Sequence, residues 1–449
     1  MTLATPKLIG LTALLGLGAL FGVFANMFGQ HVVLMLGTPL LLPLGLLLFV
    51  NPRLLFLVLI GTRCVLDPIL ESARFSSSFG LGALLNLLLI ACAVIISIQA
   101  NKTTVRQSVL LWILPLLVMA LGITYSPEPL SAFKRMIAFV SYFSVFTVGM
   151  ILIEENQLIK LLRVIVFSAV LPLLVGMYQF ATGSLAVEGR LAATFTHPNI
   201  YAFYCLLVLI VLVYLQRLQQ AAGEATPSIT EKIVQWILLV LLIVSIILTQ
   251  TRSAWLALIL IGLMYGLLFS RKTLIWLLLG LSLAALSPAV QDRVVDLFSG
   301  NEVINYSKLN SFAWRQHIWE SGLNWMSTSR YLLGYGIGGF IHHSPDFFPL
   351  SGGSKFGAHN VFVERFFDGG LLAFGVFSVF FLAQITNAFK LIKQDQFSAL
   401  VYFGLLLSYL TLNASDNVVD YLAYNWYYWV VAGAFYATAT RVVSSKASS

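Results

Sequence analysis

The sequence AWLALILIGLMYGLLFSRKTLIWLLLGLSLAALSP occupies residues 254–288 and decides the class of fold. A single helix of this length would be about 50 Å long at about 1.5 Å per residue, whereas the hydrocarbon core of a bilayer is only about 30 Å thick. The adjacent cations Arg271 and Lys272 divide the stretch into two apolar halves. We therefore predict two membrane spans here, 254–270 and 273–288.

Similar apolar runs recur along the chain, which is 59% apolar and only 10% charged. Polar and Pro/Gly breaks between the runs define fourteen predicted spans. The other twelve are 8–28, 31–50, 53–71, 80–99, 107–124, 133–153, 158–180, 199–217, 232–250, 360–386, 397–414 and 421–440. Asn26, Gln30 and His31 interrupt the first two, so a re-entrant pair and a count of twelve is the alternative.

The predicted fold class is an all-α polytopic membrane protein with about 12 to 14 transmembrane helices and one large periplasmic helical insertion. We divide it into an N-terminal transmembrane bundle (1–290), the insertion (291–358) and C-terminal transmembrane helices (359–449). The segment after Lys7 lacks a small-residue cleavage site, so we expect it to stay as a helix. The three cysteines show no CxxC spacing, which argues against a disulfide framework and a thiolate metal site.

Charge is distributed unequally between alternate connections. One side collects 14 basic and five acidic residues, a net charge of +9, and the other collects 12 basic and 13 acidic residues, a net charge of −1. The positive-inside rule makes the first side cytoplasmic, together with both termini. In a bacterium this predicts a multi-pass protein of the cell inner membrane whose insertion lies in the periplasm.

The outer cations are not needed for orientation, and an arginine near the bilayer centre costs about 2.5 to 3.5 kcal/mol on insertion scales. Each one therefore invites a functional interpretation. Snorkelling to lipid phosphates or pairing with local acids is the alternative for any single arginine.

The connection EGRLAATFTHPN, residues 188–199, is the first outer patch. Pro198 starts a new helix whose free N–H groups face the outer interface, a favourable seat for a phosphate. Arg190 is the candidate phosphate ligand here, with His197 and Asn199 in support. A helix cap beside a snorkelling arginine is the alternative.

Arginines also mark the next two patches. Arg252 lies in the polar knot TQTRSAW, residues 249–255, between two apolar runs, and Arg315 lies in WRQHIWE, residues 314–320, within the insertion. A guanidinium offers a planar fork for bidentate phosphate contact, which an ammonium does not. The spacing of the second stretch suits a helix along the membrane surface.

The strongest patch is GAHN, residues 357–360, which directly precedes an apolar run. An imidazole at the mouth of a helix bundle can take a proton from a hydroxyl near neutral pH, so His359 is the candidate general base. Asn360 and Glu364 are candidates for orienting the ring or binding a sugar hydroxyl. An interfacial histidine that caps a helix is the alternative.

The remaining motifs exclude other chemistry. The stretch LGYGIGGF, residues 333–340, lacks the strand context of a dinucleotide loop, so it predicts a tight turn near substrate that includes Tyr335. His342 and His343 would need a third ligand to hold a metal. No DxD pair occurs, so arginines would have to neutralise a diphosphate. We predict no metal and no cofactor.

In this order, the patches resemble the O-antigen ligase and Wzy-type polymerase superfamily over residues 180–385. The family motif of His-Asn, nine residues and Gly-x-x-Gly/Thr/Tyr reads here as His359, Asn360, nine residues to Gly369, then Gly370-Leu371-Leu372-Ala373, so Ala373 departs from the last position. The resemblance implies an inner-membrane transferase that moves a glycan from an undecaprenyl diphosphate carrier to a lipid- or glycan-borne hydroxyl at the periplasmic face, without nucleotide, metal or nucleic acid.

On this basis we predict that Arg190, Arg252 and Arg315 bind the diphosphate while His359 activates the acceptor, with inversion at the sugar. O-antigen ligation to lipid A-core is the first choice, and a polysaccharide polymerase or protein O-oligosaccharyltransferase is the alternative. A lipid-linked glycan transporter and a non-catalytic scaffold are rivals of other classes. Against a transporter, only Arg63 and Asp67 lie within a span, and their spacing predicts that they pair with each other.

Overall fold

The computed structural model describes residues 43–72, 80–186, 189–221, 228–295 and 311–447. The regular structure of this part of the chain is helical, without strands. Residues 43–50 are helical, and the elements that follow are α3 (Pro52–Ser72), α4 (Leu81–Gln99), α5 (Lys102–Thr124), α6 (Pro129–Glu154), α7 (Leu158–Ser168), α8 (Val170–Thr182), α9 (Pro198–Ala221), α10 (Ile229–Leu248), α11 (Arg252–Leu268), α12 (Arg271–Ala285), α13 (Pro288–Val295), α14 (Ser311–Trp325), η2 (Thr328–Arg330), α15 (Gly339–Phe347), α16 (Val361–Ile392), α17 (Gln396–Asn413), η3 (Val418–Asp420) and α18 (Leu422–Ala447).

Eight helices within the described residues are long and apolar enough to cross a membrane, counting α7 and α8 together. They confirm the prediction of an all-α, multi-pass membrane protein. The first predicted span lies outside the described residues, and the second lies mostly outside them. The count of 12 to 14 spans and the periplasmic side of the insertion stay predictions.

The stretch from 254 to 288 is divided as predicted, because α11 ends at Leu268 and α12 begins at Arg271. The two helices have 17 and 15 residues, so they are only about 26 and 22 Å long, less than the thickness of a hydrocarbon core. Gly266 lets them approach closely, since a Cβ atom there would lie 2.4 Å from Leu274 Cδ2.

The predicted span 158–180 is interrupted between α7 and α8. Pro172 has no N–H to donate to the carbonyl of Ser168, four residues earlier, so the helical ladder breaks there. The thiol of buried Cys64 donates to the Ser168 carbonyl at 3.2 Å instead. A proline that the apolar pattern does not register therefore determines this break.

The described residues form two compact units, which fall within 1–108, 140–249 and 422–449 for the first and within 109–139 and 250–421 for the second. In the first unit, α9 is buried along most of its length, and α7, α10 and α18 pack against it. Two glycines let α6 and α18 approach: a Cβ at Gly433 would lie 2.1 Å from the Phe146 carbonyl oxygen, and one at Gly149 would lie 2.2 Å from that of Val430. Small residues permit such contacts where membrane helices cross.

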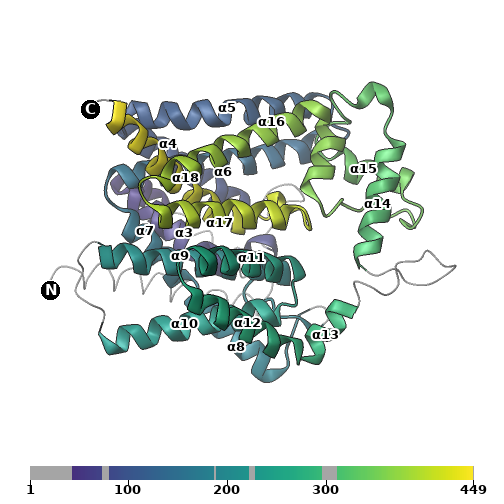
Figure 1. Ribbon diagram of the computed structural model, residues 1–449. Coiled ribbons are helices and arrows are strands. Elements are labelled where there is room, and N and C mark those ends of the chain that lie inside the picture. The colour runs from purple at the N-terminus through teal and green to yellow at the C-terminus, as the bar shows by residue number, and fades with distance from the viewer. Residues whose placement is uncertain (1–42, 73–79, 187–188, 222–227, 296–310, 448–449) are drawn as a thin grey trace. The chain divides into compact units, whose positions relative to one another are not determined.

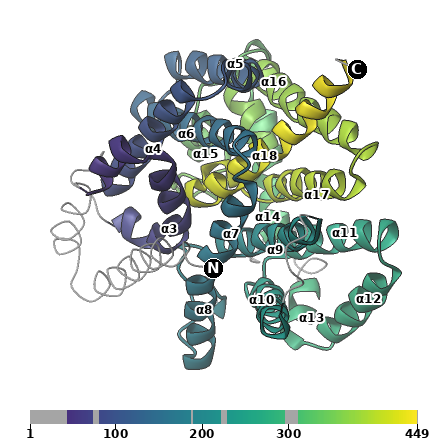
Figure 2. The same cartoon turned by 90° about the vertical axis from the view of Figure 1, so that its left-hand side faces the viewer.

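The second unit contains Arg252, Arg315 and His359, three of the predicted site residues. Its helix α17 packs against α16 on one side and α11 on the other, and α11 also packs against α12 (Figure 2). The insertion helices α14 and α15 pack against α16 near the end where that helix begins (Figure 1). Because α16 and α17 are consecutive and antiparallel, the start of α16 and the end of α17 lie at the same end of this unit.

A kink at Gly370 divides α16, with φ 61° and ψ −160°. The N–H groups of Leu371 and Leu372, which the kink removes from the helical ladder, donate to the carbonyls of Tyr331 and Leu332 at 2.8 and 3.2 Å. A Cβ at position 370 would lie 2.4 Å from the Leu332 carbonyl, so only glycine fits. The kink thus fixes the glycine-rich turn of the insertion against the membrane helix.

Candidate active site

His359 lies immediately before α16, in the left-handed backbone region at φ 48°. The next residue, Asn360, caps the helix: its side-chain oxygen accepts from the N–H groups of Phe362 and Val363 at 2.9 and 3.3 Å. The carbonyl before the histidine, that of Ala358, accepts from the Trp319 indole at 2.6 Å. These bonds hold the backbone on both sides of the imidazole, whose side chain is 42% exposed.

A buried carboxylate orients the ring. His359 Nδ1 lies 3.2 Å from Asp416 Oδ1, and the Asp416 side chain is only 2% exposed. Because a carboxylate accepts, Nδ1 carries the proton in this pair and the lone pair lies on Nε2. The ring of Trp314 lies edge-on to the imidazole, with centroids 6.2 Å apart.

Arg252 and Arg315 belong to the same unit and lie near this pair. Arg252 is the first residue of α11 and donates to the Ser311 hydroxyl at the start of α14. Burial lowers the pKa of Arg315 on α14; the positive charge of Arg252 acts in the same direction, and the negative charge of Asp416 opposes it. Arg315 is therefore within electrostatic reach of both Arg252 and Asp416.

Tyr421 adds a hydroxyl to this group. Burial raises the pKa of Tyr421 well above its usual value, and the adjacent carboxylate of Asp416 raises it further. The phenol therefore stays neutral beside Asp416 and can act as a hydrogen-bond donor. The sequence analysis did not single it out.

Glu364 does not take the ring-orienting place predicted for it. Its buried carboxylate accepts from the Arg135 guanidinium at 3.1 Å and from the Asn417 side-chain amide at 2.6 Å. Arg135 also lies 3.7 Å from Asp420. Glu364 therefore joins α16 to α6 and to the connection after α17.

Tyr335 lies within an aromatic cluster of the insertion. Its ring stacks on Phe367 with centroids 4.9 Å apart, and its hydroxyl accepts from the Ser327 N–H at 3.0 Å. Buried Asp368 holds the same turn by accepting from the N–H groups of Gly338 and Phe340, both at 2.8 Å. The glycine-rich turn is thus fixed to α16 by contacts within the protein.

The patch with Arg190, His197 and Asn199 belongs to the first unit. Arg190 donates to the Thr249 carbonyl at 2.8 Å and to the Asn199 side chain at 2.6 Å. His197 Nδ1 accepts from the N–H of Asn199 at 3.1 Å, so this ring caps its own helix. In the same unit, Arg63 and Asp67 pair at 3.0 Å as their spacing predicted.

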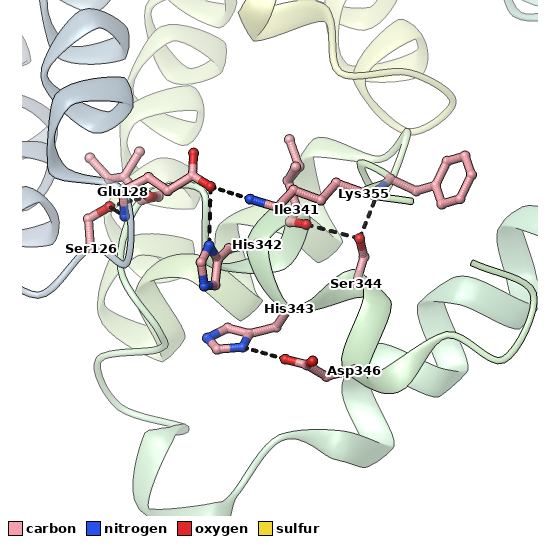
Figure 3. A network of polar contacts seen from close by, with 10 residues as sticks. Ser126, Glu128, Ile341, His342, His343, Ser344, Asp346 and Lys355 are labelled. Carbon is pink, nitrogen blue, oxygen red and sulfur yellow. Dashed lines mark hydrogen bonds and ion pairs between the residues drawn. The ribbon is translucent and has the colours of Figure 1, made fainter. Parts of the chain in front are cut away.

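His342 and His343 each contact a carboxylate (Figure 3). His342 Nδ1 lies 3.1 Å from Glu128, which also accepts from Lys355, and His343 Nδ1 lies 3.0 Å from Asp346. No group of three metal-ligating side chains occurs in the part of the chain that the structure describes. Both histidines therefore serve contacts within the insertion and with the connection before α6.

Besides Tyr421, three residues of this region were not predicted from the sequence: Asp416, Asn417 and Arg135. A usable signal was present, because the polar segment from Asn413 to Asn417 separates two apolar runs on the same predicted side as His359. The pairing itself depends on which helices are neighbours, which the sequence pattern does not specify.

The segment of the chain that contains much of this site is similar to a known family. Residues 237–378 match the O-antigen ligase family model. This match supports membership of the O-antigen ligase family for the segment that it covers. The ligase-family segment contains Arg252, Arg315 and His359, whereas Arg190 and Asp416 lie outside it. The search of curated proteins found no relative that matches the chain.

This match and the eight membrane-length helices indicate a multi-pass membrane protein with a segment similar to O-antigen ligases. The ligase-family segment runs from α10 to the middle of α16 and includes the whole insertion. It thus covers the part of the second unit that presents the arginines and the histidine.

Proposed function

We propose that the protein is an inverting glycosyltransferase that moves a glycan from an undecaprenyl diphosphate carrier to an acceptor hydroxyl at the periplasmic face of the inner membrane. The observation that carries the proposal is the pairing of an exposed imidazole, His359, with buried Asp416 beside Arg252 and Arg315. Base and anion-binding groups belong to one compact unit, as one reaction requires.

His359 acts as the general base. Asp416 keeps the proton on Nδ1 and stabilises the imidazolium that forms when Nε2 takes the proton of the acceptor hydroxyl. General base catalysis of this kind contributes about 10²- to 10⁴-fold to a rate. The half-exposed ring leaves room for an acceptor to approach.

Arg252 and Arg315 bind the diphosphate. A pair of unit charges 4 Å apart is worth about 1 kcal/mol in water and about 4 kcal/mol at the effective dielectric constant of a protein surface. Burial of Arg315 strengthens this attraction, and the mutual repulsion of the two guanidinium groups is relieved when an anion binds between them. Arg190 belongs to the first unit, and its contribution to diphosphate binding stays a prediction.

In the reaction, the acceptor oxygen forms a bond with the anomeric carbon while the bond from that carbon to the diphosphate oxygen breaks. The electron pair of the broken bond stays on the undecaprenyl diphosphate, whose growing charge the arginines stabilise. The acceptor proton passes to His359. A single displacement inverts the anomeric centre.

Ligation to lipid A-core is our first choice for the acceptor, and polymerisation or transfer to protein would use the same donor half of the site. Asn360 caps the helix that carries the base, and Tyr335 fixes the glycine-rich turn, so we assign both to support of the site. Membrane lipids are the remaining partner, because the prenyl tail must enter from the bilayer.

The test is a transfer assay with purified protein in nanodiscs, an undecaprenyl diphosphate-linked glycan and, in separate reactions, lipid A-core, free glycan ends or protein. We expect release of undecaprenyl diphosphate together with an inverted glycosidic product on one acceptor. His359→Ala should reduce the rate by about 10²- to 10⁴-fold.

His343→Ala is the matched control, because His343 pairs with a carboxylate in the same way but outside the site. It should retain most of the wild-type rate. A donor left intact with every acceptor, or full turnover by His359→Ala, would overturn the proposal. Movement of the intact donor across a vesicle membrane would favour the transporter instead.

A further inference from the structure

We propose that Glu364 and Asn417 are positioning residues: their hydrogen bond, backed by Arg135, holds Asp416 where it can orient His359. The inference rests on the proposed function and adds residues to it. Its basis is a continuous set of contacts from the Arg135 guanidinium through the Glu364 carboxylate and the Asn417 amide to Asp416.

The need for such a device follows from the connectivity. His359 precedes α16, whereas Asp416 follows α17, so two different helices carry the two members of the pair. Their 3.2 Å contact persists only if the start of α16 and the end of α17 are held together. The bond from Asn417 to Glu364 joins these two ends directly, at 2.6 Å.

Asn417 contacts Asp416 as well as Glu364. Its backbone N–H donates at 2.9 Å to Asp416 Oδ1, the same oxygen that contacts His359 Nδ1. Its side chain reaches the other way, to α16. On that helix, the N–H of Glu364 donates to the Asn360 carbonyl at 3.0 Å, one turn from the histidine. The asparagine is thus fixed at both ends.

The direction of this hydrogen bond is determined by charge. Buried Glu364 can only accept, so the Asn417 amide must present its NH₂ group to it. The Asn417 side-chain oxygen is buried and has no hydrogen-bond partner among the described residues. Leaving this oxygen unpaired costs free energy. The charge-assisted hydrogen bond from the NH₂ group to the Glu364 carboxylate offsets that cost and so fixes the orientation of the amide.

Arg135 offsets the free-energy cost of burying the Glu364 carboxylate. A guanidinium at 3.1 Å compensates the desolvation of Glu364, and Asp420, 3.7 Å from the same guanidinium, holds the arginine from the far side. A buried charge that loses its partner destabilises its surroundings. Arg135 therefore acts on the active site through Glu364.

The experiment exchanges the two side chains of the hydrogen bond between positions 417 and 364, so that the amide and the carboxylate change places. Glu364→Gln loses the charge, and Asn417→Asp places two carboxylates against each other. Each single variant should lower kcat by about tenfold or more and leave the KM for the donor within about twofold, because the catalytic base is misaligned while the diphosphate site is intact. The double variant Glu364→Gln/Asn417→Asp restores one amide-to-carboxylate bond of reversed polarity at the same net charge, and kcat should recover severalfold.

Glu155→Gln is the matched control, since Glu155 accepts from Arg53 in a part-buried pair of the first unit. It should leave both constants near their wild-type values. Single variants with normal kcat, or a double variant no better than the worse single one, would overturn the inference. Failure of the proposed function would look different, because the wild type would then leave the donor intact or His359→Ala would turn over at the full rate. Rescue is measurable even where the single variants fold poorly, because the double variant restores the contact.

Discussion

Two of the described helices, α9 and α16, follow a histidine that has an asparagine two residues or one residue after it, and the two histidines make different contacts. Before α9, His197 accepts the N–H of Asn199 and so caps the helix, while the Asn199 side chain binds Arg190. Before α16, Asn360 caps the helix and His359 turns to Asp416. Each loop also contains a non-glycine residue in the left-handed region, Ala193 at φ 51° and His359 at φ 48°.

The proposed general base, His359, therefore differs from His197 in what its ring nitrogens contact. A ring that satisfies a helix N-terminus spends its lone pair on the backbone and has no nitrogen lone pair left to accept a substrate proton. In the second loop the asparagine performs the capping, which leaves Nε2 of the histidine for chemistry. The strained backbone of His359 then aims the ring at Asp416.

The largest expected effect concerns the carboxylate partner. Asp416→Asn should lower kcat on the order of 10²- to 10⁴-fold, because a neutral amide neither fixes the tautomer of His359 nor stabilises its imidazolium. Asp346→Asn is the matched control, since it changes the exposed partner of His343. Transfer rates of both purified variants are the measurement, and equal rates would erase the distinction between a catalytic pair and a surface pair.

A smaller effect, on kcat/KM, should distinguish Arg252 and Arg315 from Arg190. Arg315→Lys and Arg252→Lys should each reduce kcat/KM about tenfold, about 1.4 kcal/mol, since an ammonium cannot make the bidentate contact of a guanidinium. Arg190→Lys should lower kcat/KM less, because its guanidinium already serves the Thr249 carbonyl and Asn199. If all three variants lose the same factor, the contacts of Arg190 within its own loop do not distinguish it from Arg252 and Arg315, and this part of the comparison is wrong.

The two caps themselves should differ little in stability. His197→Ala and Asn360→Ala each remove one capping acceptor, which costs about 1 kcal/mol of unfolding free energy. Equilibrium unfolding in detergent should show similar shifts for both variants. Only Asn360→Ala should in addition lower kcat, through the loss of the turn that aims His359. A stability loss confined to one of the two would contradict the equivalence of the caps.

The smallest expected effect is the loss of stability at low pH that follows when Glu128, in the connection before α6, no longer pairs with Lys355 of the insertion. Lys355, followed by His342, lowers the pKa of Glu128 from 4.5 to about 2. A depressed pKa in the folded state means that this contact stabilises the protein fully above about pH 4.5 and is lost as the pH falls through about 2. Wild type and Glu128→Gln should therefore differ in unfolding midpoint at neutral pH and converge near pH 2. A difference that persists at pH 2 would assign the effect to packing.

Much of the architecture followed from the sequence because the bilayer imposes a length on apolar helices. The split of residues 254–288 at Arg271 was confirmed. The break between α7 and α8 was not predicted, since Pro172 lies in a uniformly apolar run and leaves no trace in hydropathy. The kink at Gly370 was missed for a related reason: its cause is the approach of Tyr331 and Leu332, which are distant in sequence.

For the candidate active site, local sequence patterns were enough to identify the chemical groups: the arginines, a histidine before an apolar helix, and the family motif that surrounds it. Their partners depend on the packing of the helices, which places Asp416 against His359 and places Glu364 against Arg135 and Asn417. The physical reason is the range of the forces. Hydrophobic periodicity and charge bias act along the chain, whereas a hydrogen bond of 3 Å depends on which helices pack side by side.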